Sequence, residues 1–345
     1  MNIELAYLVL ALSAGFFMAW GIGANDVANA MGTSVGSRAI SIKQAIIIAA
    51  IFEFLGAIVA GGEVTSTIKA GIVNPDSFAT TPDIFIMGML AALFATAIWL
   101  LIASLAGWPV STTHTIVGAI IGFGLASMHG DAIVWGNISY IMLSWLVSPC
   151  LGGVIAYLIF FAIQKFIFSK QYSKSRTKKI KAILKKLMII TACIMAFTHG
   201  SNDVANAIGP VSAIIGMLSI TQDLQLNMPL WISVLGACGI VIGLTMYGHK
   251  VIATVGNGIT QLTPITGFAI TMAAALTVAM ASIIGMPVST THTVVGAILG
   301  IGLARGIAAI NLSAIRSIFL SWIITLPVGA ILAAIIFKIL QLIFC

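Results

Sequence analysis

Charged side chains are scarce in this chain of 345 residues: 7% are Asp, Glu, Lys or Arg, whereas 60% are hydrophobic. A soluble domain carries about 25% charged residues, so this composition excludes a protein whose surface is mainly exposed to water. Apolar stretches of about 20 residues, enough to cross a hydrocarbon core of about 30 Å, recur along the whole chain. The stretches are continuous rather than alternating, which favours membrane-spanning helices over a β-barrel.

Cysteine is also scarce. No Cys-x-x-Cys pair is present, and three of the four cysteines lie in apolar segments. The four are Cys150, Cys193, Cys238 and Cys345. We expect small buried side chains rather than a metal site or disulfides. The first 20 residues are apolar without a basic start, which indicates a first membrane helix rather than a cleaved signal peptide.

The positive charge is concentrated in one segment. Nine of the 16 Lys and Arg residues lie between Lys165 and Lys186, and they account for the net charge of +7. Such a cluster beside membrane helices is typical of a cytoplasmic loop. This interpretation leaves no reason to expect nucleic acid as a partner.

Two blocks of sequence occur twice. Residues 23–32 read GANDVANAMG and residues 200–209 read GSNDVANAIG, an offset of 177. Residues 107–126 and 285–304 share the run PVSTTHT and are identical at 16 of 20 positions, at an offset of 178. Two blocks with nearly the same offset indicate that one ancestral half is present twice.

The duplication predicts an all-α polytopic membrane protein of two inverted repeats, with 10–12 transmembrane or re-entrant helices. Residues 1–164 would form the first repeat, 165–186 the basic cytoplasmic loop, and 187–345 the second repeat. Because each half has five apolar segments, the second half is inverted in the membrane relative to the first. In this topology 14 of the 16 Lys and Arg residues lie on the cytoplasmic side, and both termini lie on the outer side. Inverted repeats are typical of secondary transporters, whose site lies at the repeat interface.

The first repeated block contains the NDVAN motif, residues 25–29 and 202–206. A carboxylate with amide oxygens suits Na⁺, and the carboxylate alone could carry a proton. The alternative is an Asp that joins broken helices. Glycines around the first copy predict an interrupted helix: Gly21, Gly23 and Gly32.

The second repeated block contains the STT motif, Ser111–Thr113 and Ser289–Thr291, each following a proline, Pro109 or Pro287. Helix N-termini bind anions through free N–H groups and the helix dipole. The alternative is ordinary capping of each motif's own helix. Because neither motif contains Lys or Arg, a bound oxyanion would need co-bound cations at Asp26 and Asp203, which predicts symport.

Four other polar residues are candidates. His114 and His292 follow the STT motifs and either donate to the anion or serve the structure. His199 precedes the second NDVAN motif, where the first half has Ile22. Glu53 lies deep in an apolar segment, as a coupling carboxylate or a packing group.

With its duplicated NDVAN and STT motifs, the chain resembles the inorganic phosphate transporter family, PiT, over nearly its whole length. The resemblance implies a transporter that moves phosphate with Na⁺ or H⁺, and the family includes members that resemble sulfate permeases. It assigns phosphate to the STT residues and two amides: Ser111, Thr112, Thr113, Ser289, Thr290, Thr291, Asn25 and Asn202. It assigns the coupling cation to Asp26, Asn29, Asp203, Asn206 and Glu53. A Na⁺ ion would bind at the four NDVAN residues of this set. Thr271 stands where many members carry a second glutamate.

We therefore expect a secondary symporter in the cell membrane that imports phosphate with Na⁺ or H⁺, without a cofactor, and that forms a homodimer. Sulfate is the alternative substrate. An uncoupled anion channel is the alternative of another class. An enzyme acting on phosphorylated lipids is disfavoured, because no nucleophile is paired with a positioned base.

Overall fold

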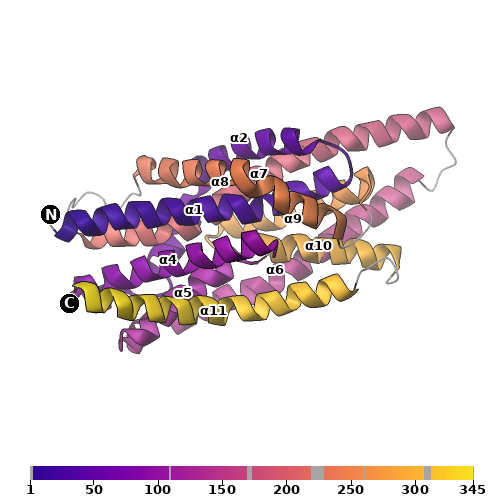
Figure 1. The fold of residues 1–345 in the computed structure, drawn as a ribbon. Coiled ribbons are helices and arrows are strands. Elements are labelled where there is room, and N and C mark those ends of the chain that lie inside the picture. The colour runs from indigo at the N-terminus through magenta and orange to yellow at the C-terminus, as the bar shows by residue number, and fades with distance from the viewer. Residues whose placement is uncertain are drawn as a thin grey trace.

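The computed structural model describes residues 3–108, 110–168, 173–218, 229–258, 262–306 and 312–344. These residues form long helices that lie roughly along one direction (Figure 1). Within the described ranges there is no β-strand, and one isolated bridge joins Val73 to Ile133. The protein is the all-α membrane protein that the sequence predicts.

The first half contains α1 to α6, and the second half contains α7 to α11. The bounds in the first half are α1 Ile3–Gly36, α2 Ile42–Ala60, α3 Gly62–Ala70, α4 Pro82–Ala106, α5 Thr112–Ala126 and α6 Trp135–Ala162, with short helical turns at Pro75–Phe78 and Gly130–Ala132 and a π-helix at Ile163–Phe168. Those in the second half are α7 Lys174–Met217, α8 Leu230–Gly258, α9 Pro264–Ile283, α10 Thr290–Arg305 and α11 Leu312–Phe344.

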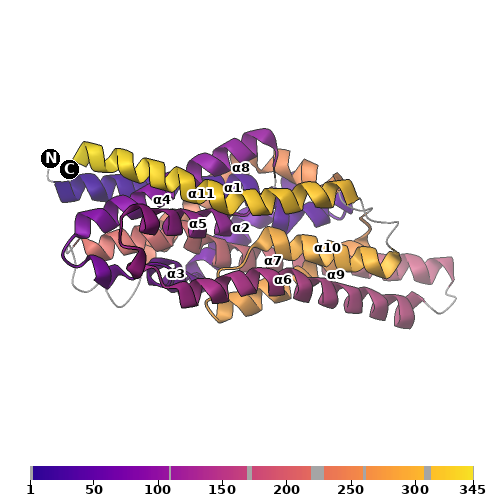
Figure 2. The same ribbon diagram turned by 90° about the horizontal axis from the view of Figure 1, so that it is seen from below.

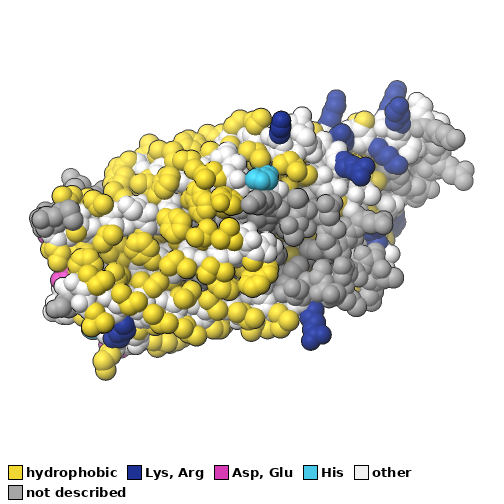
Figure 3. All heavy atoms as spheres, viewed as in Figure 1, with side chains coloured by type: hydrophobic (Ala, Val, Ile, Leu, Met, Phe, Trp, Pro, Cys, Tyr) yellow, Lys and Arg dark blue, Asp and Glu magenta, His cyan; other side chains and the backbone are white. Residues whose placement is uncertain are grey.

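Seven helices among the described residues are long and apolar enough to cross a membrane. They are α1, α2, α4, α6, α8, α9 and α11, and the shorter α5 is also apolar. Helix α7 is not in this set, and its apolar stretch is interrupted by the polar residues of the second NDVAN motif. Hydrophobic side chains cover most of the face shown in Figure 3, and Lys and Arg gather toward the end where α7 begins.

The termini lie at one end of the bundle, and the start of α7 lies at the other (Figures 1 and 2). Most of the segment expected to be a basic loop is helical. Ser173 caps α7 by accepting a hydrogen bond from the Arg176 N–H, and the helix runs on for 44 residues. Residues 174–186 of this segment are helical, because a run rich in Lys favours a helix once an N-cap starts it.

Helix α1 is continuous, so the predicted interruption at Gly21, Gly23 and Gly32 is wrong. Gly23 instead allows close packing: a Cβ there would overlap the backbone of Ile240 in α8. Gly243 of α8 faces the backbone of Trp20 in the same way. The glycines bring two helices into backbone contact rather than unwinding one.

The same packing occurs twice, between opposite halves. Gly200 of α7 packs against the backbone of Glu53 in α2, just as Gly23 of α1 packs against Ile240 in α8. A second pair of contacts joins α5 to α11 and α10 to α6, through Gly118 and Gly296 respectively. The two halves are therefore interleaved, and each repeated helix packs on a helix of the other half.

Candidate transport site

Two helices begin at the STT motifs. Ser111 and Ser289 are the N-caps of α5 and α10, and each hydroxyl accepts a hydrogen bond of 3.2 Å from the backbone N–H three residues later. Pro109 lies outside the described residues. The capping that the sequence offered as an alternative is therefore present, although a capping hydroxyl still has its own proton to donate.

The two helix starts meet. Thr113 donates to the carbonyl of Val288 at 3.1 Å, and Thr291 donates to the carbonyl of Val110 at 3.3 Å. Each start is thus held by a residue of the other half. Because both are N-termini, the positive ends of two helix dipoles converge on one place inside the protein.

The NDVAN motifs lie against these helix starts. Asn29 donates to Thr291 at 2.8 Å, and Asn206 donates to Thr113 at 3.2 Å. The hydroxyl of Thr112 donates to the carboxylate of Asp26. The structure brings together the two motifs that the sequence singled out.

The second aspartate has the equivalent contact, since Thr290 donates to Asp203 at 3.1 Å. Both carboxylates are almost fully buried, with exposed fractions of 2% for Asp26 and 1% for Asp203. Each aspartate is therefore linked by one hydroxyl to the helix start of its own half.

Asn25 and Asn202 make a different contact from the one expected. Asn25 donates to the Ser104 hydroxyl at 3.3 Å and to the Trp108 carbonyl at 3.2 Å, beyond the end of α4. Asn202 donates to Ser282 at 3.1 Å and to the Met286 carbonyl at 3.2 Å. Their amide nitrogens thus hold the ends of α4 and α9, and only their oxygens remain for a ligand.

Several buried oxygens of the two motifs have no hydrogen-bond partner. They are Oδ1 of Asn25, Asp26, Asn202, Asp203 and Asn206. A buried acceptor without a partner costs about 1–3 kcal/mol, so five of them in the two copies of one motif indicate a ligand that supplies positive charge or donors. Carboxylate and amide oxygens are the ligands that a hard cation prefers.

His199 completes this cluster. Its Nδ1 lies 3.2 Å from Glu53 Oε1, and its Nε2 lies 3.0 Å from Asp203 Oδ2. Asp26, His199 and Asp203 each offer a ligand atom within 4.8 Å of the others. The sequence pointed to His199 only through its position before the second NDVAN motif, where the first half has Ile22.

The packing identifies the residue of the second half that corresponds to Glu53. Glu53 and Ile240 occupy equivalent positions, because each faces the equivalent glycine, Gly200 or Gly23. Thr271, where the family resemblance placed a second acid, lies on α9 and bonds to Thr33 at 2.7 Å. Beside Asp203 lie His199 of α7 and Glu53 of α2, whereas the equivalent positions beside Asp26 hold Ile22 of α1 and Ile240 of α8.

Positive charge is missing from the site. Among the described residues, none of the buried polar side chains is Lys or Arg, whereas Asp26, Asp203 and Glu53 are all buried. Buried carboxylates need a positive partner. His199 can partner two of them at most, so the donor set fits at least one bound cation.

His114 and His292 do not face the STT hydroxyls. His114 packs on Trp145 and His292 on Trp322, with ring centroids 3.8 and 3.5 Å apart. They follow the STT motifs in sequence, but their rings line a separate apolar pocket. This placement disfavours the hypothesis that they donate to the anion.

Known proteins are similar to this chain over nearly its whole length. The profile of the "Phosphate transporter family" matches residues 22–333. A protein of Haemophilus influenzae is 47% identical, covering 96% of both chains, and one of Chlamydia trachomatis is 40% identical, covering 98% of this chain and 99% of its own; both carry the name "Putative phosphate permease". A solved structure, described as "The sodium-dependent phosphate transporter", has a TM-score of 0.92, with 35% identity over 98% of this chain and 100% of that one.

The apolar helices, the buried polar centre and these matches define a membrane transporter rather than an enzyme. The chain belongs to the phosphate transporter family. The family resemblance on the NDVAN and STT motifs is thereby confirmed.

Proposed function

We propose that the protein imports inorganic phosphate together with Na⁺. The observation that carries the proposal is the set of unpartnered buried oxygens on the NDVAN motifs, whose side chains bond to two converging helix starts. Helix N-termini favour an anion, and the oxygens favour a cation, so the two charges stabilise each other in one site. The similar solved structure is that of a sodium-dependent transporter, and this likeness supports Na⁺ over H⁺.

The hydroxyls of Thr112 and Thr290 provide a link between the two ions. Both now donate to the carboxylates of Asp26 and Asp203. A cation at these carboxylates would take over as their partner, and the two hydroxyls could then turn to donate to phosphate. Cation binding would in this way raise the affinity for phosphate, which is thermodynamic coupling and is reciprocal.

The orientation in the membrane follows the distribution of charge. We propose that the end carrying residues 165–186 faces the cytoplasm and that both termini face outward. The equivalent helices α1 and α7 run in opposite directions in Figure 1, which supports two inverted repeats and alternating access at their interface. The cell membrane as location and a homodimer stay predictions.

The topology has a direct test. Ser175→Cys and Asp131→Cys each place a thiol on an exposed residue, the first at the start of α7 and the second in the turn Gly130–Ala132 before α6. We expect a membrane-impermeant maleimide added to intact cells to label residue 131 and not residue 175. Labelling of both from the same side would contradict the orientation.

Uptake into proteoliposomes tests the function. Labelled phosphate and labelled sulfate are supplied under an inward Na⁺ gradient, an inward H⁺ gradient, or neither. We expect concentrative phosphate uptake with Na⁺ and little sulfate uptake. Phosphate uptake driven by an H⁺ gradient alone would show that H⁺ is the coupling ion. Phosphate flux that needs no cation gradient would support the anion channel instead.

A further inference from the structure

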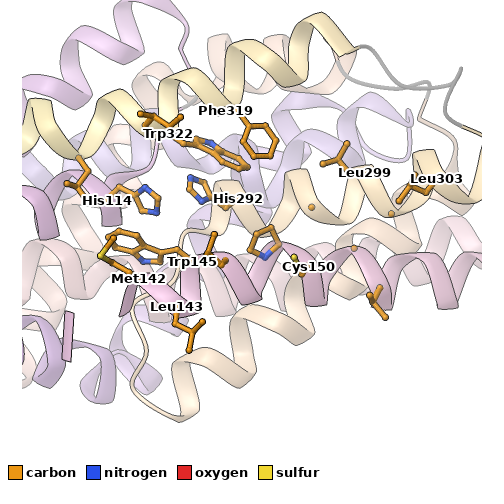
Figure 4. A pocket seen from close by; sticks show the side chains of 18 of the residues that line it. His114, Met142, Leu143, Trp145, Cys150, His292, Leu299, Leu303, Phe319 and Trp322 are labelled. Atoms are coloured by element: carbon orange, nitrogen blue, oxygen red, sulfur yellow. The ribbon is translucent and has the colours of Figure 1, made fainter. Parts of the chain in front are cut away.

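A pocket of about 1260 Å³ lies apart from the proposed ion site, between α6, α10 and α11. Its walls are apolar side chains, several of which are labelled in Figure 4. Leu146, Val154 and Ile323 line it with exposed fractions of 69%, 56% and 70%, so the pocket opens on the outer, apolar surface of the bundle. A molecule could enter it from the surrounding lipid.

The deep end of this pocket is a row of four rings. Trp145, His114, His292 and Trp322 follow one another, with centroid distances of 3.8, 4.2 and 3.5 Å. Figure 4 shows the two imidazoles between the two indoles. Both histidines are more than nine-tenths buried, with exposed fractions of 6% and 3%.

Three polar atoms of this row lack hydrogen-bond partners. They are Nε2 of His114, Nε2 of His292 and Nε1 of Trp322. Trp145 differs, because its Nε1 donates to the carbonyl of Pro287 at 3.1 Å. An apolar cavity with a few unpaired polar groups at one end is the usual form of a small-molecule site.

The three atoms restrict what the molecule can be. An indole N–H only donates, whereas an imidazole nitrogen accepts or donates according to its tautomer. A hydroxyl group matches them because it donates and accepts at once. A charged head group is disfavoured, since no Lys, Arg, Asp or Glu is among the residues that line the pocket in the described part of the chain.

We propose that this pocket binds an uncharged long-chain amphiphile with a hydroxyl head, drawn from the lipid phase. Its hydrocarbon chain would lie against α6 and α11, and its hydroxyl would bond to the two histidines. His114 and His292 directly follow Thr113 and Thr291, so the ligand would hold both helix starts and slow their movement. That consequence rests on the proposed function, whereas the binding itself does not.

Cys150 provides a native reporter, because it is exposed, has a free thiol and lines the pocket. The full chain in nanodiscs of palmitoyl-oleoyl-phosphatidylcholine is labelled with a lipophilic maleimide, in the presence of hexadecanol or hexadecyl methyl ether. The ether accepts a hydrogen bond but cannot donate one. Cys150→Ala gives the background from the other cysteines.

We expect hexadecanol to protect Cys150 at a concentration about three to ten times lower than the ether, as the loss of one net hydrogen bond implies. Equal protection by the two compounds would overturn the recognition of a hydroxyl. No protection by either would overturn the site.

A matched pair of variants tests the location independently. Val154 and Val147 both lie on α6 with exposed fractions of 56% and 50%, but only Val154 is among the lining residues. Crosslinking of a diazirine-bearing hexadecanol should fall about tenfold in Val154→Trp and stay unchanged in Val147→Trp, since a filled pocket excludes the chain. Equal crosslinking in the two variants would contradict the proposal, and size-exclusion profiles establish that both fold.

Phosphate uptake by the same samples separates the two proposals. Binding of the alcohol without any phosphate uptake would support the pocket and contradict the transport function. Phosphate uptake without binding of the alcohol would support the transport function and contradict the pocket.

Discussion

The two central aspartates occupy equivalent positions in α1 and α7 but have different neighbours. Asp203 lies 3.0 Å from His199, which in turn lies 3.2 Å from Glu53. At the equivalent positions beside Asp26, the chain has Ile22 and Ile240. The threonine contacts to the two aspartates, by contrast, are the same on both sides.

This difference separates two parts of the site. The part formed by the helix starts is symmetric, which suits an anion bound on the axis between the halves. The part formed by the carboxylates is asymmetric, so cations bound on the two sides would not be equivalent. In the proposed function, duplication would supply the symmetric part, which binds the anion, and later substitutions on one side would adjust the part that binds the cation.

The largest effect is expected from removing either carboxylate. Asp26→Asn and Asp203→Asn should each lower Na⁺-driven phosphate uptake by about 100-fold or more, because loss of a buried charge partner costs about 3–5 kcal/mol. Initial uptake rates in proteoliposomes measure this, with the amount of folded protein matched by size exclusion. Uptake at the wild-type rate in either variant would refute the cation role of that residue.

A smaller effect concerns stability and the Glu53–His199 pair. His199→Ile leaves Glu53 buried without a partner and should lower the free energy of unfolding by about 3–5 kcal/mol. Glu53→Ile with His199→Ile copies the apolar side of Asp26 and should be less destabilised than the single variant. Unfolding in mixed micelles compares them, and a double variant less stable than His199→Ile would show that the two residues do not act as a pair.

The helix starts should respond equally in both halves. Ser111→Ala and Ser289→Ala each remove a hydroxyl that we propose donates to phosphate, and the loss of a net hydrogen bond of about 1 kcal/mol should raise the phosphate KM about fivefold. Ser66→Ala is a control, because this exposed hydroxyl only bonds to its own helix at Gly62. Unequal effects of the two capping variants would break the symmetry of the anion site.

The smallest effect is expected at Thr271. Thr271→Ala loses the 2.7 Å hydrogen bond to Thr33, which costs about 1 kcal/mol of stability. The ratio of Na⁺ to phosphate transported should not change, because Glu53 corresponds to Ile240 and not to Thr271. Flux measurements with labelled Na⁺ and labelled phosphate give this ratio. A changed ratio in Thr271→Ala would show that Thr271 takes part in the coupling.

The sequence predicted much of this arrangement because duplication left exact repeats of polar residues in apolar segments. The NDVAN and STT motifs were placed together correctly, since residues such as Asn29 and Thr291 had few other polar partners available. The course of the helices was harder to predict. Glycines such as Gly23 permit either unwinding or close packing, and only the neighbouring helix decides between them.

His199 and Glu53 show the other limit of the sequence. They are 146 positions apart, and their contact depends on the packing of α2 against α7 through Gly56 and Gly200. No local pattern links them. The roles of Asn25 and Asn202 depend likewise on where α4 and α9 end, which propensity alone does not determine.

Phosphate binding as a function of Na⁺ tests the central claim most directly. Calorimetric titration of the purified protein with phosphate, in Na⁺ and in choline at equal ionic strength, gives the two dissociation constants. We expect tight binding in Na⁺ and binding at least about tenfold weaker in choline, a typical coupling of 1–3 kcal/mol, with the difference lost in Asp203→Asn. Equal affinity in the two salts would contradict the claim that a cation completes the anion site.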